Sequence, residues 1–291
     1  MLKFSSPVAG CMRWGKWGAN YSTAAYRKMI ETCLDHGITA FDHADIYGDY
    51  TTEEEFGNAL KEAPALRSQM QLITKCGIQM LTENRPHHQI KSYNTSAKHI
   101  IQSTERSLKN FGTDYLDVLF IHRPDPLLNP IEVAEAITHL KEQGKIKHFG
   151  VSNFLPHQTE VLRKYILIEF NQIEISIIHL TAFIDGTLDN CLQHNIVPMA
   201  WSPMGGGMFT DESHHRFRSI TAAATELAEK YNTGIDQILV TWLLFHPSGI
   251  IPVVGSTKLD RLLQAKEANH IHLSREDWFK LWIASTGEDV A

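Results

Sequence analysis

Residues Val118–His122 read VLFIH, an apolar run that ends on a histidine. Short apolar runs of this kind, alternating with helical segments, are typical of parallel strands that are covered on both faces. Six further stretches share this form, and each ends on a polar or chemically useful residue: Ile38–Asp42 (ITAFD), Gln71–Lys75 (QLITK), His148–Asn153 (HFGVSN), Ile168–Gln172 (IEFNQ), Val197–Ser202 (VPMAWS) and Gly249–Ser256 (GIIPVVGS).

Helical periodicity fills the spaces between these runs. A short first strand near Val8–Met12 brings the number of expected strands to eight, which predicts a single (β/α)8 TIM barrel over residues 1–291 with an extra C-terminal helix. An open, doubly wound sheet fits the same rhythm, but no strand runs into a Gly-x-Gly-x-x-Gly turn. The expected helices are Thr23–His36, Thr52–Glu62, Ala97–Asn110, Ile131–Gln143, Pro156–Tyr165, Asp185–His194, Ile220–Tyr231, Ile235–Phe245, Leu259–Ala268 and Arg275–Ser285.

Composition excludes several classes of protein. The formal net charge of −6 argues against a nucleic-acid-binding surface. No segment approaches the ~20 apolar residues of a membrane span, and the N-terminus lacks a secretory signal. The four cysteines form no Cys-x-x-Cys pair, which favours a reduced, cytoplasmic protein. No heptad or repeat indicates an assembly, so a monomer is the default expectation.

Four polar side chains follow the early runs in a pattern that suits proton transfer. Asp42 ends one run, Tyr47 follows in a loop where Gly48 lets the backbone turn, and Lys75 and His122 end the next two runs. A tyrosine has a pKa of about 10, and a nearby ammonium lowers it by ~1–3 units. Asp42 would keep Lys75 charged in a dry pocket, and His122 would orient a carbonyl oxygen. This pattern predicts a general-acid site.

Each of these residues alone has an ordinary structural explanation. An aspartate at a strand end is more often a helix cap, and a single lysine is usually a solvated charge. The four together at successive strand ends are harder to attribute to chance. The 16 histidines include the adjacent pairs His87-His88 and His214-His215 in polar loops, where neighbouring residues seldom face one metal, so no metal site is expected.

The ordered motifs resemble those of the aldo-keto reductase family, and in particular its bacterial YdhF-like branch. The resemblance runs from about residue 8 to the end of the chain and is carried by FDHADIYG, ITKCG, LFIHRPD, GVSNF, FNQIE, WSPMGGG and VVGSTKLDR. It implies a TIM barrel and the NADPH-dependent reduction of a small aldehyde or ketone. It also implies that Tyr47 is the general acid, Lys75 lowers its pKa, Asp42 pairs with Lys75, and His122 orients the substrate.

The same resemblance assigns the cofactor site. It implies that Ser152, Asn153 and Gln172 bind the nicotinamide carboxamide, and that Trp201 stacks on the ring. The pyrophosphate would lie along Ser202, Pro203, Met204, Gly205 and Gly206. The clamp for the adenosine 2′-phosphate, which favours NADPH over NADH, would consist of Gly255, Ser256, Thr257, Lys258 and Arg261.

Two further expectations concern the mouth and the floor of the barrel. Trp14, Trp17 and Tyr50 follow the first two strands and are candidates for an apolar substrate pocket, with packing on neighbouring helices as the alternative. The family's β-hairpin over the barrel floor is expected to be reduced, because the leader before Cys11 is short. An alternative function is that of a nicotinamide-binding redox sensor or accessory subunit, although the intact four-residue site favours an enzyme.

Overall fold

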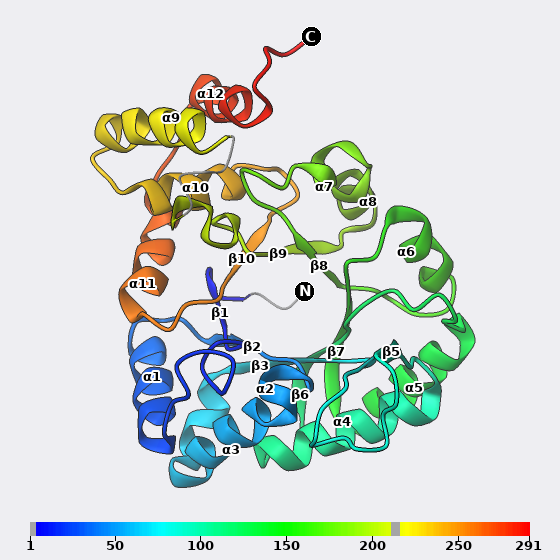
Figure 1. Ribbon diagram of the computed structural model, residues 1–291. Coiled ribbons are helices and arrows are strands. Elements are labelled where there is room, and N and C mark those ends of the chain that lie inside the picture. Colours follow the sequence, from blue (N-terminus) through cyan, green and yellow to red (C-terminus); the bar gives the residue numbers. More distant parts are fainter. Residues whose placement is uncertain (1–3, 211–215) are drawn as a thin grey trace.

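The computed structural model describes residues 4–210 and 216–291 and contains a closed barrel of eight parallel strands. Figure 1 looks along the barrel, with the helices arranged in a ring around it. In order around the barrel the strands are β1 (Val8–Gly10), β2 (Ala40–Asp42), β3 (Gln71–Cys76), β6 (Leu116–Ile121), β7 (Ile146–Ser152), β8 (Phe170–Glu174), β9 (Val197–Trp201) and β10 (Ile251–Val254), and β10 pairs with β1. The predicted TIM barrel is confirmed.

The predicted helices are present close to their expected bounds. Ser96 and Ser274 accept hydrogen bonds from the backbone N–H groups of the first turns of α4 and α12, and so cap these helices. The helices are α1 (Thr23–Asp35), α2 (Tyr47–Tyr50), α3 (Thr52–Glu62), α4 (Ala97–Phe111), α5 (Pro130–Glu142), α6 (Pro156–Arg163), α7 (Thr181–Ile184), α8 (Thr187–His194), α9 (Phe217–Lys230), α10 (Ile235–Leu244), α11 (Leu259–Glu267) and α12 (Arg275–Thr286), with 3₁₀ turns η1 (Pro64–Gln69), η2 (Gly205–Thr210) and η3 (Ala268–His270).

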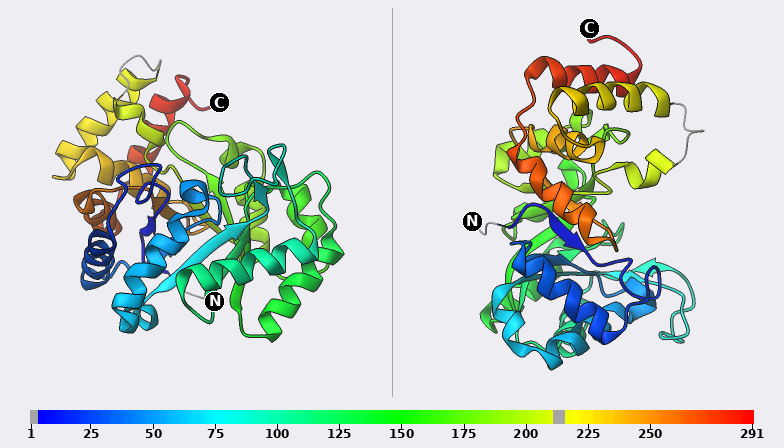
Figure 2. Two further views of the ribbon diagram at one scale, coloured as in Figure 1. Left: turned by 60° about the horizontal axis from the view of Figure 1, so that its bottom comes forward. Right: turned by 90° about the vertical axis from the view of Figure 1, so that its left-hand side faces the viewer.

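Two helices lie beyond the ring. Figure 2 shows α9 and α12 side by side outside the barrel helices, and their apolar residues share one buried cluster with α10. The α12 helix is the extra C-terminal helix that the sequence predicts. None of the helices in the described part of the chain is both long and apolar enough to cross a lipid bilayer.

The barrel interior is a packed core of its own. Alternate side chains on β6 point in opposite directions: Val118 and Phe120 belong to the interior cluster, whereas Leu119 and Ile121 belong to the layer beneath the helices. The floor is closed by Phe4, whose ring lies 5.2 Å from that of Phe170 between centroids. The sequence predicts that the floor hairpin is reduced. Residues 4–7 contain no strand, and the side chain of Phe4 covers the floor in its place.

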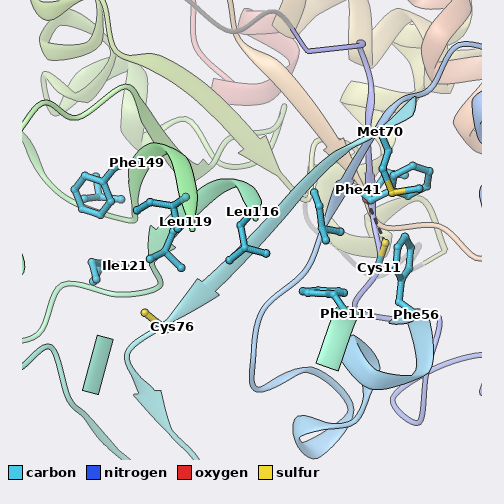
Figure 3. Close-up of a cluster of buried hydrophobic side chains, with 14 of the residues drawn as sticks. Cys11, Phe41, Phe56, Met70, Cys76, Phe111, Leu116, Leu119, Ile121 and Phe149 are labelled. Carbon is cyan, nitrogen blue, oxygen red and sulfur yellow. Dashed lines mark hydrogen bonds between the residues drawn. The ribbon is translucent and has the colours of Figure 1, made fainter. Parts of the chain in front are cut away.

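The outer layer joins the strands to the helices. Figure 3 shows this layer, where Phe56 of α3 and Phe111 of α4 meet Phe41 of β2. The Phe56 ring lies 5.5 Å from that of Phe41 and 6.0 Å from that of Phe111, measured between centroids. Burial of large aromatic side chains on both faces of the strands fixes the barrel, and it leaves the carboxyl ends of the strands free for polar residues.

The sequence analysis missed a hairpin over the mouth of the barrel. After β3 the chain forms β4 (Ile78–Gln79) and β5 (Ser92–Tyr93), which pair antiparallel with Ile78 opposite Tyr93 and Gln79 opposite Ser92. Each strand has only two residues, too few to show the alternation by which strands are recognised in a sequence. This hairpin contributes side chains to the site.

We expect Phe120→Ala to lower the free energy of unfolding by about 3–5 kcal/mol, because the ring is fully buried in the barrel interior and its removal leaves a cavity. Urea denaturation followed by tryptophan fluorescence measures the change. Leu127→Ala is the matched control: Leu127 is 88% exposed, and its loss should change stability by no more than about 0.5 kcal/mol. Equal effects of the two substitutions would contradict the packed interior.

Candidate active site

The carboxyl ends of the barrel strands surround one cleft of about 670 Å³. Asp42 ends β2, Lys75 is the second-last residue of β3, and His122 directly follows β6. The backbone N–H of His122 donates to the carbonyl oxygen of Cys76 at 2.8 Å, which ties the end of β6 to the end of β3. The four residues that the sequence singled out therefore converge at one mouth, where TIM-barrel enzymes hold their active sites.

A buried ion pair lies at the base of this cleft. The Lys75 Nζ donates to both Asp42 carboxylate oxygens, at 2.8 Å and 2.7 Å, and to the carbonyl oxygen of His43 at 2.7 Å. Lys75 is 1% exposed and Asp42 is 3% exposed. Burial acts to lower the pKa of Lys75, but the attraction of Asp42 and Tyr47 outweighs it, so the pKa is raised above its usual value. Lys75 is therefore a charged ammonium at neutral pH.

The Tyr47 hydroxyl lies beside this ammonium. The distance from Lys75 Nζ to Tyr47 Oη is 3.3 Å. Burial raises the pKa of the phenol above its usual value, while the Lys75 ammonium acts to lower it. Lys75 thus acts on the pKa in the direction expected from the sequence, but the net pKa is raised because desolvation of the phenolate exceeds the stabilisation by Lys75. The phenol is fully protonated at neutral pH, as a proton donor must be.

A strained turn presents Tyr47 to the cleft. The three residues after it have left-handed backbone, with φ of 60° at Gly48, 59° at Asp49 and 72° at Tyr50. A Cβ at Gly48 would lie 2.5 Å from Thr52 Oγ1, so glycine is required by space as well as by backbone angle. The expectation that Gly48 lets the chain turn is confirmed. Strain of this kind is concentrated at functional sites.

The His122 ring completes the proton-transfer group. It lies 6.1 Å from the Tyr47 ring between centroids, at an interplanar angle of 80°. Burial, the Lys75 ammonium and Arg123 hold the pKa of His122 well below its usual value. Its Nδ1 is buried without a hydrogen-bond partner among the described residues. A neutral imidazole with one N–H group suits the orientation of a substrate carbonyl oxygen.

A chain of hydrogen bonds continues from the ion pair to the aromatic wall of the cleft. Gln172 Nε2 donates to Asp42 Oδ1 at 2.9 Å, and the Ser152 hydroxyl donates to the Gln172 carbonyl oxygen at 2.8 Å. Asn153 Nδ2 donates to Ser152 Oγ at 2.8 Å, and Trp201 Nε1 donates to Asn153 Oδ1 at 3.1 Å. The residues that the resemblance assigned to nicotinamide binding therefore form one connected group.

The predicted phosphate-binding residues lie at the other end of the cleft. Some of them line the cleft and others do not. Three consecutive glycines after β9 have left-handed backbone, with φ of 71° at Gly205, 61° at Gly206 and 102° at Gly207. The predicted residues that line the cleft directly are Ser202, Pro203, Met204, Gly206, Gly255 and Arg261. The other predicted phosphate-binding residues, Gly205, Ser256, Thr257 and Lys258, do not line the cleft, and neither does Lys75 of the proton-transfer group.

The segment before α11 is held by aromatic side chains from the first loop. Trp14 Nε1 donates to the Ser256 carbonyl oxygen at 3.0 Å, and the Tyr21 hydroxyl donates to the Thr257 carbonyl oxygen at 2.5 Å. The Lys258 backbone N–H donates to Ser256 Oγ at 3.0 Å. These bonds fix the N-terminus of α11, which with Lys258 and Arg261 has the chemistry of an anion-binding site.

Of the three aromatic residues expected at the mouth, one lines the cleft and two do not. Trp17 lines the cleft. Trp14 is fully buried and packs against Tyr21, Tyr26 and other rings, so the alternative of packing on neighbouring helices is the correct one for it. Tyr50 lies outside the cleft, where its hydroxyl donates to Ile78 O at 3.3 Å and accepts from Met80 N at 3.0 Å.

Several cleft residues were missed by sequence reasoning. The β4–β5 hairpin contributes Ile78, Met80, Lys91 and Tyr93, and Arg123 follows His122 directly. The position of Arg123 directly after a strand end could have indicated that it lies at the cleft. For the hairpin residues no periodic signal exists, because their strands are so short.

Histidines near the hairpin make local contacts. The His87 and His88 rings lie 4.7 Å apart between centroids, and His88 Nδ1 lies 2.9 Å from Met80 O. No group of three or more His, Cys, Asp or Glu side chains in residues 4–210 and 216–291 is arranged to hold a metal ion. His214 and His215 lie outside the described residues.

Comparison with known proteins agrees with this geometry. The sequence model of the Aldo/keto reductase family matches residues 8–283. The chain is 46% identical to the uncharacterized oxidoreductase YcsN of Bacillus subtilis, over 99% of this chain and 97% of that protein. It is 44% identical to the oxidoreductase YdhF of Escherichia coli, over 99% and 96% of the two chains. It is also 38% identical to a 6-dehydroglucose reductase of Agrobacterium fabrum, over 100% and 97%.

A solved structure gives the same result. The thermostable aldo-keto reductase Tm1743, determined in complex with the inhibitor epalrestat, superimposes with a TM-score of 0.78 at 26% sequence identity, covering 95% of this chain and 94% of that one. The match of the family model across nearly the whole barrel, together with these relatives, shows that the chain belongs to the aldo/keto reductase family.

Proposed function

We propose that the protein reduces aldehydes and ketones to alcohols with NADPH, and that Tyr47 is the general acid. The observation that carries this proposal is the 3.3 Å contact between the Tyr47 hydroxyl and the Lys75 ammonium, which Asp42 holds in place at the base of the cleft. Membership of the family and the similarity to reductases support carbonyl reduction as the reaction class.

The proton donor works through its neighbours. The raised pKa of Tyr47 keeps its proton available across the neutral range. As the proton leaves, the phenolate gains a partner in the Lys75 ammonium at 3.3 Å. A neutral His122 donates an N–H to the substrate oxygen and holds it beside the Tyr47 hydroxyl. Since Lys75 and His122 are buried and Tyr47 is partly buried, their electrostatic interactions are stronger than they would be in solvent.

The cleft fits a nicotinamide dinucleotide, which supplies a hydride when bound. Ser152, Asn153 and Gln172 would hold the carboxamide, and Trp201 would lie against the ring. The glycines at 205–207 have left-handed backbone and no side chains, so a pyrophosphate could approach the backbone closely there. The residues from Gly255 to Arg261 would bind the 2′-phosphate at the N-terminus of α11.

We propose in addition that residues 1–291 act as one catalytic domain, in the cytoplasm and as a monomer. The four cysteines are buried free thiols, which suits a reducing compartment. Size-exclusion chromatography with light scattering tests the oligomeric state.

We expect Tyr47→Phe to lower kcat for aldehyde reduction by about 10²–10⁴-fold, because it removes the proton donor. Binding of NADPH, followed by the quenching of tryptophan fluorescence, should stay close to wild type. Tyr165→Phe is the matched control, because Tyr165 is 50% exposed and lies outside the cleft. Most of the activity remaining in Tyr47→Phe would exclude Tyr47 as the acid. Tight binding without turnover by the wild-type protein would favour the redox-sensor alternative.

The pH dependence of kcat/KM follows from the two pKa directions. A general acid acts in its protonated form, and the pKa of Tyr47 is raised above 10.0. His122 acts in its neutral form, and its pKa lies well below 6.5. The rate of reduction should therefore be flat from about pH 6.5 to about pH 9 and fall only above that range. A loss of activity centred near pH 7 would contradict the assignment of Tyr47 if it occurs as the pH rises, and that of His122 if it occurs as the pH falls.

Lys258→Gln and Arg261→Gln should each weaken NADPH binding about tenfold, because each removes a charge-assisted contact to the 2′-phosphate. NADH lacks this phosphate and is the internal control, so its dissociation constant should change by less than about twofold. Paired fluorescence titrations with the two nucleotides measure both constants. Equal weakening of NADPH and NADH would show that these side chains support the fold of the cleft and not the phosphate.

A further inference from the structure

Cationic side chains without partners line the cleft. The side chains of Arg13, Lys91 and Arg123 have no ion pair or hydrogen bond with the residues that the structure describes. Among the residues that the structure describes, the acidic ones that line the cleft are Asp42 and Asp236. Asp42 is neutralised by Lys75, so the space beside Tyr47 carries an uncompensated positive charge. A charge of one sign in a cleft favours a ligand of the opposite sign.

Lys91 belongs to the Tyr47 side of the cleft. The register of the hairpin pairs Ile78 with Tyr93 and Gln79 with Ser92, and one step further places Lys91 across from Met80. Ile78 and Met80 pack in one apolar cluster with Tyr47. Figure 1 shows β5 on the opposite side of the barrel from α11, whose N-terminus is the proposed site of the 2′-phosphate. Lys91 is therefore remote from the proposed cofactor phosphates.

Arg123 is close to the reacting groups. It follows His122 directly, and its charge contributes to the low pKa of that imidazole. Its guanidinium carbon lies 5.7 Å from the centroid of the Trp201 ring. Its charge also acts on the carboxylate of Glu174, which does not line the cleft and lies 2.7 Å from His179 Nε2. The guanidinium therefore retains donor groups for a ligand.

We propose that the carbonyl substrate carries an anionic group, a carboxylate or a phosphate, which Lys91 and Arg123 bind while Tyr47 and His122 hold the carbonyl oxygen. Trp17, Met80 and Tyr93 also line the cleft and would contact the body of the substrate. This inference rests on the proposed function. Lys91 and Arg123 are then specificity-determining residues, because a neutral substrate would leave two cations facing the cleft without partners.

The test compares two aldehydes that differ in charge, 4-carboxybenzaldehyde and methyl 4-formylbenzoate. For each enzyme form, kcat/KM for the acid is divided by kcat/KM for the ester, so that general effects of a substitution on the site cancel. Lys91→Gln and Arg123→Gln should each lower this ratio by roughly three- to tenfold, mainly through the KM of the acid. Lys91→Arg should restore most of the ratio, because it keeps the charge.

Lys28→Gln is the matched control, since Lys28 is an exposed lysine on α1 outside the cleft, and its ratio should equal that of wild type. Raising the ionic strength should lower the wild-type ratio and leave the ratio of the double variant Lys91→Gln/Arg123→Gln nearly unchanged. Turnover of both aldehydes with the same ratio in every form would overturn the anionic-substrate proposal while leaving the reductase intact. No turnover of either aldehyde would overturn the proposed function, and this inference with it.

Discussion

The site depends on the ion pair between Asp42 and Lys75. A buried carboxylate and a buried ammonium are each unfavourable alone, and together they are tolerated only when their hydrogen-bonding groups are satisfied. Here the ammonium has the two carboxylate oxygens and a backbone carbonyl as acceptors, and Gln172 donates to the carboxylate. The Tyr47 hydroxyl is a further, longer contact of the same ammonium, at 3.3 Å. The structural demand of burying a charge and the chemical demand of supporting a phenolate are met by the same group.

Much of this arrangement could be predicted from the sequence, because the relevant signals are local. An apolar run that ends on a polar residue marks the carboxyl end of a buried strand, and a closed barrel brings all such ends together. The positions of Asp42, Lys75 and His122 at the cleft follow from that rule alone. The bounds of the helices follow from periodicity and from caps such as Ser96 and Ser274.

Other features depend on contacts that no local pattern records. Trp14 was a candidate for the mouth because it follows a strand end, yet it is buried among rings contributed by several elements. The net pKa direction of Tyr47 depends on how much water the assembled cleft excludes, which is a property of the whole barrel. The β4–β5 hairpin consists of two-residue strands separated by a long loop, so it carries no periodicity to detect.

The hairpin also has a bearing on how new specificities arise on this barrel. The groups that move protons and those assigned to the nucleotide come from the barrel strands, their ends and α11, whereas Met80, Lys91 and Tyr93 come from a ribbon inserted between β3 and α4. No barrel strand uses this ribbon as a hydrogen-bonding neighbour. The ribbon can therefore change in length and sequence without breaking a hydrogen bond between barrel strands, provided that the contacts of Ile78 and Met80 beside Tyr47 are kept.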